Sequence, residues 1–409
     1  MDRTTAHPPA AATEDGLWFG KDLSQPEAIP ESGIARAVEL MRSGRLHRYG
    51  ENGGSEPEPS LLEQEYAAYV GAKYCVALNS CGATLFVALK TLAVAPGDRV
   101  LTSTFTLAPV PGAIAHAGAD PILVETTAGY TTDLADLERK AARSGARVFL
   151  ISHMRGHITD MQAVREICDA HGIAVVEDCA HTMGARWDGR ASGTWGKIGC
   201  YSTQTYKHIN SGEGGLLVTD DEDVCAQAIL FSGSYMLYHQ HLARPADAVF
   251  DRWRYTTPNF SMRMSNHAAA MLRPQLADMP RRAAAWNALY AKLVRELSGV
   301  HQLSVPARDP REEFVASSIQ FTLALSAERI ERFLAGCDRR GLHIKWFGRS
   351  EPQGFTSNYT HWRYLRQTQD VPASLPLMAG LCDMRIALSL TDDDCALIGR
   401  IVRAALTES

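Results

Sequence analysis

The middle of the sequence alternates short apolar runs with segments of helical periodicity, and this alternation restricts the folds that the chain can adopt. The apolar run Tyr74–Leu78 is typical of a strand, and the apolar residues of the following segment, 83–92, have helical spacing. The alternation continues, with strands expected at 99–102, 121–125, 147–152 and 173–177 and helices at 109–117, 134–144 and 163–171. This pattern predicts an α/β domain with a mostly parallel sheet, whose loops at the carboxyl ends of the strands carry the chemistry.

The pattern loosens after this region. A further strand is expected at Leu216–Thr219, followed by a weakly periodic stretch, 234–258, that we interpret as an irregular excursion. The segment 265–296 returns to helical periodicity, and we expect interruptions at Pro274 and Pro280 because proline lacks the amide hydrogen that a helix interior needs.

The chain changes character again from about Val300. A short strand is expected at Ile319–Leu325, an exposed helix at 327–340 and a terminal helix at 392–406. A chain of 409 residues is long enough for more than one domain. We therefore expect three parts, namely a disordered tail, a large N-terminal domain and a small C-terminal α+β domain, at 1–14, 15–285 and 286–409.

Composition excludes several classes of protein. Hydrophobic residues make up 45% of the chain and charged residues 21%, as in ordinary soluble globular proteins. The net charge of −5 and the scattered basic residues give no electrostatic reason to expect nucleic acid or an anionic membrane as partner. No run of about 18 apolar residues predicts a membrane span. The Ala-, Pro- and Thr-rich segment Met1–Glu14 lacks the features of a signal peptide.

The nine cysteines have unequal spacings and form no CxxC pair, which argues against a disulfide framework or a zinc ribbon. Most of them stand among apolar residues, where a small buried thiol is the ordinary outcome. We therefore expect a protein of the reducing cytoplasm with no bound metal.

Two separated residues indicate a specific cofactor. Lys207 precedes the turn Gly212-Glu-Gly-Gly215, and Asp178 ends the apolar strand upstream of it. Enzymes that use pyridoxal phosphate (PLP) need a lysine amine for the Schiff base and a carboxylate that keeps the pyridine nitrogen protonated. Each residue alone has an ordinary alternative, since Asp178 could cap the following turn and Lys207 could be a solvated loop lysine. His181 could bond Asp178 or the phenolic oxygen of the cofactor, or lie on the surface.

A phosphate site is expected where a strand passes into a helix at Asn79-Ser-Cys-Gly-Ala83. The backbone amides of Ser80, Cys81 and Gly82 would stand at a helix N-terminus, which favours anions. The hydroxyl of Ser202 could donate to the same phosphate. Cys81 could instead act as a nucleophile, but no base lies near it in the sequence.

A stacking partner for the cofactor is expected after the second strand. Phe105 in Thr104-Phe-Thr106 could stack on the pyridine ring, although core packing explains it equally well.

Several motifs in a fixed order resemble one known family. They are His153-Met-Arg-Gly156, Asp160-Met161, Val175-Val-Glu-Asp178, Ala180-His181, Gly184-Ala185, the glycines 189, 193 and 199, Ser202, Lys207 and Gly212-Glu-Gly-Gly215. Together they resemble the DegT/StrS sugar aminotransferases, which are PLP-dependent enzymes of fold-type I. The similarity covers about Glu63–Leu276 and, more loosely, the rest of the chain. It implies a fold-type I large domain with helices on both sides of the sheet.

The resemblance also implies roles for individual residues. Lys207 matches the lysine that binds the cofactor and moves the proton, Asp178 the partner of the pyridine nitrogen, His181 its neighbour, and Phe105 the stacking aromatic. The cofactor phosphate would be held by Ser80, Cys81, Gly82 and Ser202, although the family often has Gly-Thr where this chain has Cys81-Gly82. Gln204 resembles the residue of a subgroup that acts on cyclitol ketones.

Members of the family are homodimers in which an asparagine from the partner subunit completes each site. This chain reads Pro258-Asn-Phe-Ser-Met-Arg-Met-Ser265, which allows two registers against the family motif. We choose Asn259 as the residue that reaches the partner's cofactor, and Ser261 is the rival.

The resemblance implies an aminotransferase that takes an amino group from glutamate or glutamine and gives it to a ketone on a sugar, a nucleotide-linked sugar or a cyclitol. Amino-sugar and antibiotic pathways use such steps. The alternatives are a pyridoxamine phosphate (PMP)-dependent sugar dehydratase, in which His stands in place of the lysine, other PLP chemistry, and a regulatory protein without turnover. His208 lies next to Lys207. The stretch His343–Arg349 could close over a polar substrate or pack inside the small domain.

Overall fold

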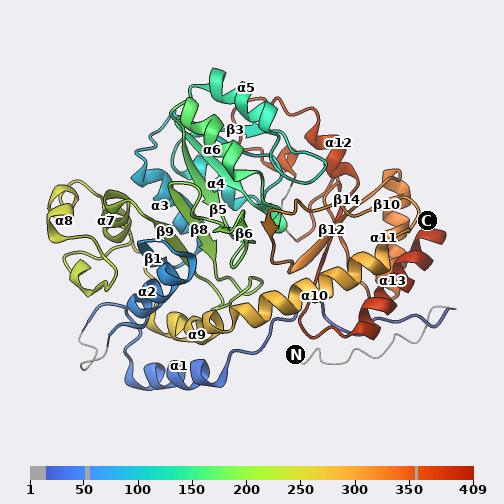
Figure 1. Ribbon diagram of the computed structural model, residues 1–409, viewed down its shortest axis with the longest axis horizontal. Helices are drawn as coiled ribbons and strands as arrows, with labels where there is room; N and C mark the ends of the chain where they lie inside the picture. Colours follow the sequence, from blue (N-terminus) through green and yellow to red (C-terminus); the bar gives the residue numbers. More distant parts are fainter. Residues whose placement is uncertain (1–14, 51–55, 355–357) are drawn as a thin grey trace.

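The computed structural model describes residues 15–50, 56–354 and 358–409, so the expected tail at 1–14 lies outside the described residues. Its centre is a seven-stranded sheet with the order β1-β9-β8-β5-β4-β2-β3 (Figure 1). The strands are β1 (Tyr74–Leu78), β2 (Arg99–Ser103), β3 (Asp120–Val124), β4 (Val148–Ser152), β5 (Ala174–Asp178), β8 (Ile198–Ser202) and β9 (Gly215–Thr219).

Five of these strands, from β8 to β3, run parallel to one another, and β9 pairs antiparallel with both β8 and β1. The predicted mostly parallel sheet is therefore confirmed. Strand β8 escaped sequence-based prediction because Gly199 interrupts its apolar run, and glycine weakens the signal of a strand. A β carbon on Gly199 would lie 2.2 Å from the carbonyl oxygen of Gly193, so the close approach of these segments requires glycine.

Helices cover both faces of the sheet. One face packs against α3 (Cys81–Thr91), α4 (Pro109–His116) and α7 (Glu222–Phe231), with α8 (Asp247–Trp253) outside α7. The other face packs against α2 (Glu58–Val70), α5 (Leu134–Ser144), α6 (Met161–Ala170) and α9 (Asn266–Ala277), with α1 (Glu31–Ser43) against α9. Successive residues of a strand alternate between these faces. Val176 lies in the apolar cluster of α3, whereas Val175 lies in that of α6, so Asp178 is directed to the α3 face.

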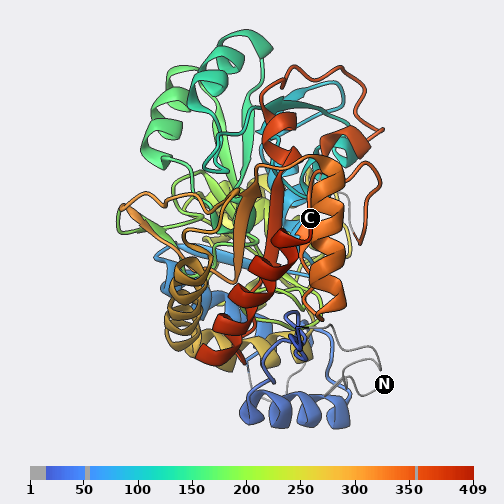
Figure 2. The same ribbon diagram turned by 90° about the vertical axis from the view of Figure 1, so that its right-hand side faces the viewer.

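A second sheet lies toward the C-terminal part of the chain, with the antiparallel order β10-β12-β14-β13. Its strands are β10 (Leu303–Ser304), β12 (Ser318–Leu323), β13 (Lys345–Trp346) and β14 (Leu381–Arg385). The helices of this part are α11 (Ala327–Arg339), α12 (Ser374–Ala379) and α13 (Asp392–Thr407), and α11 packs against α13 (Figure 2). The expected strand near 319–325 and the helices at 327–340 and 392–406 are confirmed. The two-residue strands are too short to leave a periodic signal.

Helix α10 (Met279–Leu297) extends from the large sheet to the small one (Figure 1). The expected division between residues 285 and 286 falls inside this helix, and the assignment of two domains stays a prediction. A third, small sheet joins β11 (Glu312–Glu313) to β6 (Arg186–Trp187) and β7 (Arg190–Ala191). Short 3-10 turns occupy η1 (Met154–Gly156), η2 (Tyr238–Gln240) and η3 (Tyr359–His361).

Two expectations about the long helical segment need correction. Pro274 lies inside α9 and does not end it, while the break falls at Asp278, between α9 and α10. Pro280 stands in the first turn of α10, where a missing amide hydrogen costs nothing. The helix continues through Pro274 because α9 is packed between α1 and α2, and this packing outweighs one lost hydrogen bond. The stretch 234–258 also holds more regular structure than expected, namely η2 and α8.

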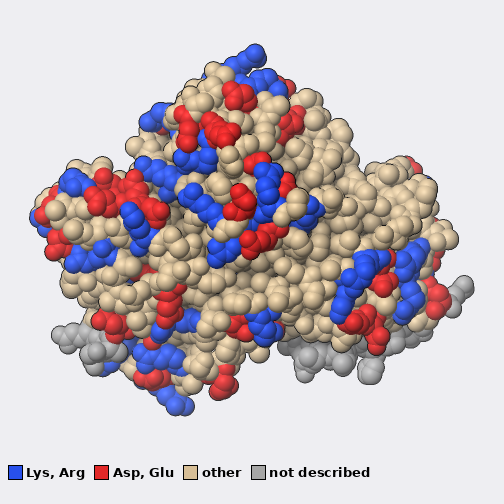
Figure 3. Space-filling view, viewed as in Figure 1, with Lys and Arg blue, Asp and Glu red and all other residues tan. Residues whose placement is uncertain are grey.

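Figure 3 shows basic and acidic side chains mixed over one face of the molecule. This mixture agrees with the scattered charges of the sequence. All nine cysteines lie in the described part of the chain and are free, and eight of them are buried. Among the described helices, none is long and apolar enough to cross a membrane.

Candidate active site

Asp178 stands at the carboxyl end of β5 with its side chain almost fully buried. The hydroxyl of Ser152, at the end of the adjacent β4, donates to Oδ2 of Asp178 at 2.7 Å. The backbone amide of Ala180 donates to Oδ1 at 3.1 Å, so the turn that sequence reasoning offered as an alternative is present as well. Ser152 is held in turn by Thr106, whose hydroxyl donates to it at 2.8 Å. These bonds fix the orientation of the carboxylate at the end of the sheet.

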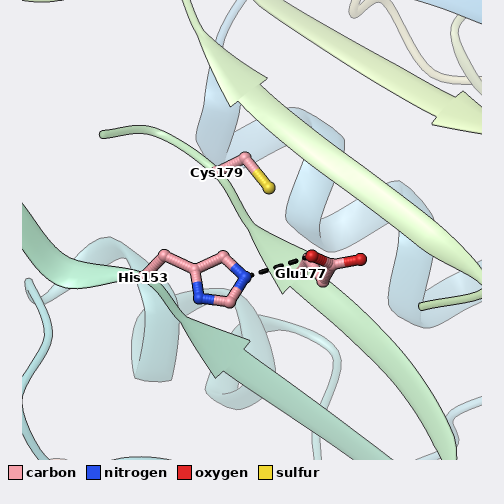
Figure 4. Close-up of side chains that lie close together, drawn as sticks. All are labelled: His153, Glu177 and Cys179. Carbon is pink, nitrogen blue, oxygen red and sulfur yellow. Dashed lines mark hydrogen bonds and ion pairs between the residues drawn. The ribbon is translucent and has the colours of Figure 1, made fainter. Parts of the chain in front are cut away.

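Glu177, the residue before Asp178, is directed to the opposite face of the sheet, as Val175 is. Figure 4 shows its carboxylate beside His153 and Cys179. One oxygen of Glu177 lies 3.1 Å from Nε2 of His153 and accepts the amide of Gly193 at 2.8 Å, and the other accepts the amide of Gly196 at 2.6 Å. Cys179 lies beside this pair, and the three side chains are close enough to share a metal ion. Because the amides already occupy the carboxylate, hydrogen bonding accounts for the cluster.

Lys207 and His181 meet at the centre of the site, where Nζ of Lys207 lies 3.1 Å from Nε2 of His181. Burial lowers the pKa of Lys207 to about 8, and the positive charge of Arg155 adds to this effect. Burial also lowers the pKa of His181 well below its usual range, with Lys207 as the next cause. The lysine is therefore partly neutral near physiological pH, and the imidazole is neutral.

The expected phosphate loop forms the N-terminus of α3. Ser80 caps this helix, since its hydroxyl accepts the amide of Ala83 at 3.0 Å, and the first turn begins at Cys81. The first residue of β9 packs directly against this loop, because a β carbon on Gly215 would lie 2.4 Å from the carbonyl oxygen of Ser80. Burial raises the pKa of the Cys81 thiol to about 12, which opposes a nucleophilic role for this residue.

The other predicted site residues differ in burial. Ser202 ends β8 and is buried, and its hydroxyl accepts the amide of Gln204 at 3.3 Å. Phe105 is buried in an aromatic cluster, with its ring centre 5.2 Å from that of Phe347, so its stacking on a cofactor stays a prediction. Asn259 and Ser261 are both exposed, in a segment that runs beside the phosphate loop: the amide of Asn79 donates to the carbonyl oxygen of Met262 at 2.8 Å.

The structure adds basic residues that sequence reasoning did not assign. Arg155, in the turn after β4, forms a buried ion pair with Asp383 of β14 at 2.8 Å. Arg385 of β14 donates from Nη1 to the carbonyl oxygen of Tyr206 at 3.2 Å, next to Lys207. Arg155 belongs to the motif His153-Met-Arg-Gly156, but nothing in the sequence showed that the small sheet would lie against it.

Comparison with known proteins identifies the family of the chain. The family model of the DegT/DnrJ/EryC1/StrS aminotransferase family matches residues 28–403.

The chain belongs to this family.

Relatives with assigned names agree with this membership. The spore coat polysaccharide biosynthesis protein SpsC of Bacillus subtilis is 30% identical over 67% of this chain and 70% of its own length. A putative L-glutamine:3-amino-2,3-dideoxy-scyllo-inosose aminotransferase of Micromonospora echinospora is 31% identical over 64% of this chain and 61% of its own length.

Solved structures agree as well. The aminotransferase TlmJ of Streptoalloteichus hindustanus superposes with a TM-score of 0.80 at 21% identity, over 94% of this chain and 98% of its own, and shows the shared fold. DesV of S. venezuelae is 26% identical with a TM-score of 0.77, over 92% of this chain and 95% of its own. As a member of the DegT/DnrJ/EryC1/StrS family, the protein is a PLP-dependent aminotransferase.

The residues around Lys207 fit the cofactor of the DegT/DnrJ/EryC1/StrS family. PLP carries a phosphate, an aldehyde and a pyridine nitrogen, which need an anion site, an amine and a carboxylate. The N-terminus of α3 offers free amides for an anion, and the close contact of Gly215 with Ser80 leaves no room for a side chain behind that loop. Lys207 supplies a buried amine and Asp178 a fixed carboxylate.

Proposed function

We propose that the protein transfers an amino group from glutamate or glutamine to a ketone on a sugar, a nucleotide-linked sugar or a cyclitol, with Lys207, His181 and Asp178 as the catalytic residues. The contact of Lys207 with His181 carries this proposal, because it places a partly neutral amine beside a neutral imidazole in a buried site. The names of the relatives support a sugar or cyclitol acceptor, since one of them is named for a scyllo-inosose derivative.

When bound, PLP supplies the carbon that carries the amine and a ring that accepts electrons. The residues of the chain do the rest. Lys207 serves as base and acid, since a pKa of about 8 lets it take up and return a proton near neutral pH. His181 orients the amine of Lys207 through the 3.1 Å contact. Asp178 presents a carboxylate to the pyridine nitrogen, and the bonds from Ser152 and Ala180 keep it in place.

The phosphate of the cofactor is proposed to lie against the amides of Ser80, Cys81 and Gly82, with Ser202 and Gln204 at the edge of the same loop. Phe105 is proposed to face the ring. The anion site at a helix N-terminus supports the first assignment.

We further propose a homodimer of the cytoplasm with shared active sites, in which Asn259 of each subunit reaches the phosphate of the other. Asn259 is exposed, and its segment runs beside the phosphate loop of its own subunit, so a partner docked on this face would bring the residue near a second site. The free cysteines support a reducing compartment.

A dehydratase is the main alternative within this fold, and the position of His208 opposes it. The imidazole of His208 is buried against the ring of Trp286, with the ring centres 5.2 Å apart. Burial lowers the pKa of His208 to about 4, so it cannot replace Lys207 as a base with a pKa near neutrality.

The test is an assay of the PLP-loaded protein with 15N-labelled glutamate or amide-labelled glutamine and a panel of keto-sugars, nucleotide-linked keto-sugars and keto-cyclitols. The proposal expects the label in the product and no turnover in Lys207→Ala. A product that has lost water and gained no label would support the dehydratase and contradict the proposal.

A further inference from the structure

A cavity of about 480 Å³ lies between the segment 21–24 and the small sheet. Its volume is in the range of sites for small molecules. The basic side chains that line it are Lys21, Arg155, Lys345, Arg349 and Arg385, and the acidic ones are Asp22, Asp338 and Asp383. Part of this charge is balanced at the rim, where Lys21 pairs with Asp394 at 2.6 Å, Arg349 with Glu331 at 3.1 Å and His343 with Asp338 at 2.7 Å.

The inner wall of the cavity concentrates positive charge. Arg155 pairs with the carboxylate of Asp383, whose negative charge also acts on Lys345 and Arg385, and Asp22 is the second carboxylate that acts on Arg385. Asp383 already pairs with Arg155 at 2.8 Å and accepts the amide of Gln320 at 2.7 Å. Burial lowers the pKa of Lys345 to about 7, and the charge of Arg155 adds to this effect more than Asp383 opposes it. Buried like charges of this kind favour an anionic ligand.

Arg155 is held in this wall at a conformational cost. Its backbone has φ of +57°, the left-handed region that side chains other than glycine rarely adopt. The next residue, Gly156, packs against the carbonyl oxygen of His181, which a β carbon at Gly156 would approach to 3.2 Å. The turn that carries Arg155 therefore packs against His181, whose side chain contacts Lys207.

The cavity reaches Lys207 through Arg385. This arginine lines both the large cavity and a smaller hollow of about 50 Å³ that is lined by Lys207. The guanidinium carbon of Arg385 lies 4.7 Å from the centre of the Tyr206 ring, and Nη1 donates to the carbonyl oxygen of Tyr206. A group bound by Arg385 would therefore stand beside the loop that carries the reacting amine.

This cavity is separate from the proposed cofactor phosphate loop. Among the described residues that line it, none belongs to the set Ser80, Cys81, Gly82 and Ser202. An anion in the cavity would belong to a substrate and not to PLP.

We propose that this cavity is a subsite for an oxyanion, a carboxylate or a phosphate, carried by the small molecule that reacts at Lys207, that Arg385 binds it, and that the buried charges of Arg155 and Lys345 attract it. The inference rests on the proposed function, since it concerns the substrates of that same site. Two sources share this chemistry. One is a carboxylate of the amino donor, and the other is a phosphate on the acceptor.

The test measures binding to the PLP-loaded enzyme by calorimetry, with glutarate as a probe for the donor carboxylate and inorganic phosphate as a probe for the acceptor. Binding is measured below pH 7, where Lys345 is protonated, so Lys345→Met removes one cation from the wall and Lys345→Arg keeps the charge. Lys197→Met is the matched control, because Lys197 pairs with Asp221 on the surface outside the cavity.

The proposal expects Lys345→Met to weaken at least one probe by roughly tenfold or more, as for the loss of one buried charge near a bound anion, while Lys345→Arg and Lys197→Met stay within about twofold of the wild type. An effect on glutarate alone assigns the cavity to the donor, and an effect on phosphate alone assigns it to the acceptor. Unchanged binding of both probes in Lys345→Met, or no binding to the wild type, would overturn the subsite. Neither result depends on turnover, so failure of the proposed function would be seen separately in the labelled-nitrogen assay.

Discussion

Nζ of Lys207 lies 3.1 Å from Nε2 of His181, and burial lowers the pKa of both side chains. The two residues come from different loops, one after β5 and the other after β8. The parallel pairing of β5 with β8 brings these loops together at the same edge of the sheet. The pair therefore depends on the sheet and not on local sequence.

His181→Asn tests the role of this contact. Loss of the imidazole should lower kcat by roughly a hundredfold, because a base that is no longer held transfers its proton poorly. The cofactor should still attach to Lys207, as measured by borohydride reduction and mass spectrometry. An unchanged kcat, or a lost attachment, would contradict a positioning role for His181.

Gly215→Ala tests the packing behind the phosphate loop. Its β carbon would stand 2.4 Å from the carbonyl oxygen of Ser80 and 2.7 Å from the amide nitrogen of Cys81, so the loop must move. We expect PLP to bind at least about tenfold more weakly, as measured by fluorescence titration.

Gly212→Ala is the matched control for this variant. Gly212 has φ of +83° but no neighbour within 4 Å of a β carbon, so the change should cost about 1–2 kcal/mol of stability and leave PLP affinity unchanged. Equal PLP affinities in Gly212→Ala and Gly215→Ala would count against the assigned loop.

The stability of the PLP-free protein should rise with pH just above neutrality. Lys345 has a folded-state pKa of about 7 and an ordinary value of 10.5, so between these values the unfolded chain binds more protons than the folded one. Burial of the charged Lys345 lowers the free energy of unfolding by its full amount below pH 7, and this loss becomes smaller as the pH rises above 7. Urea midpoints at pH 7 and 8.5 should therefore increase more for the wild type than for Lys345→Met. If the urea midpoint increases by the same amount in the wild type and in Lys345→Met, the pKa of Lys345 is not lowered in the folded protein.

Subunit complementation tests the shared active site. Lys207→Ala and Asn259→Ala should each be inactive or weak alone. Mixed dimers would contain one intact site if Asn259 acts across the interface, and random mixing should then restore about a quarter of the wild-type activity. If the mixture stays inactive and the same experiment with Ser261→Ala restores activity, Ser261 is the residue that acts across the interface.

Part of this site could be predicted from the sequence because Asp178 stands at the end of a predicted strand, whereas Lys207 follows β8, which was not predicted, and was assigned from the Gly212-Glu-Gly-Gly215 turn after it. Asp178 closes a strand that begins with the apolar run Ile173–Val176, and the loops after parallel strands meet at one edge of the sheet. The opposite orientation of Glu177 also follows from the alternation of side chains along a strand.

The basic wall of the cavity could not be predicted in the same way. Arg155 and Asp383 are far apart in the chain, and their ion pair depends on how the small sheet docks against the large one. Strand β13 has only two residues and gives no periodic signal, so the position of Lys345 in the cavity was hidden. Pro274 shows the same limit, since the packing of α1 and α2 against α9 overrides a local helix breaker.

The central claim is that Lys207 carries the cofactor. Lys345 is a second lysine with a similarly lowered pKa near this site, so a test must distinguish the two. Both lysines have a lowered pKa, about 8 and about 7, and both line hollows that Arg385 connects. The most direct measurement is borohydride reduction of the PLP-loaded protein followed by peptide mapping. We predict the pyridoxyl group on Lys207 and none in Lys207→Ala. A pyridoxyl group on Lys345, or on Lys207→Ala to the same extent as on the wild type, would contradict the account.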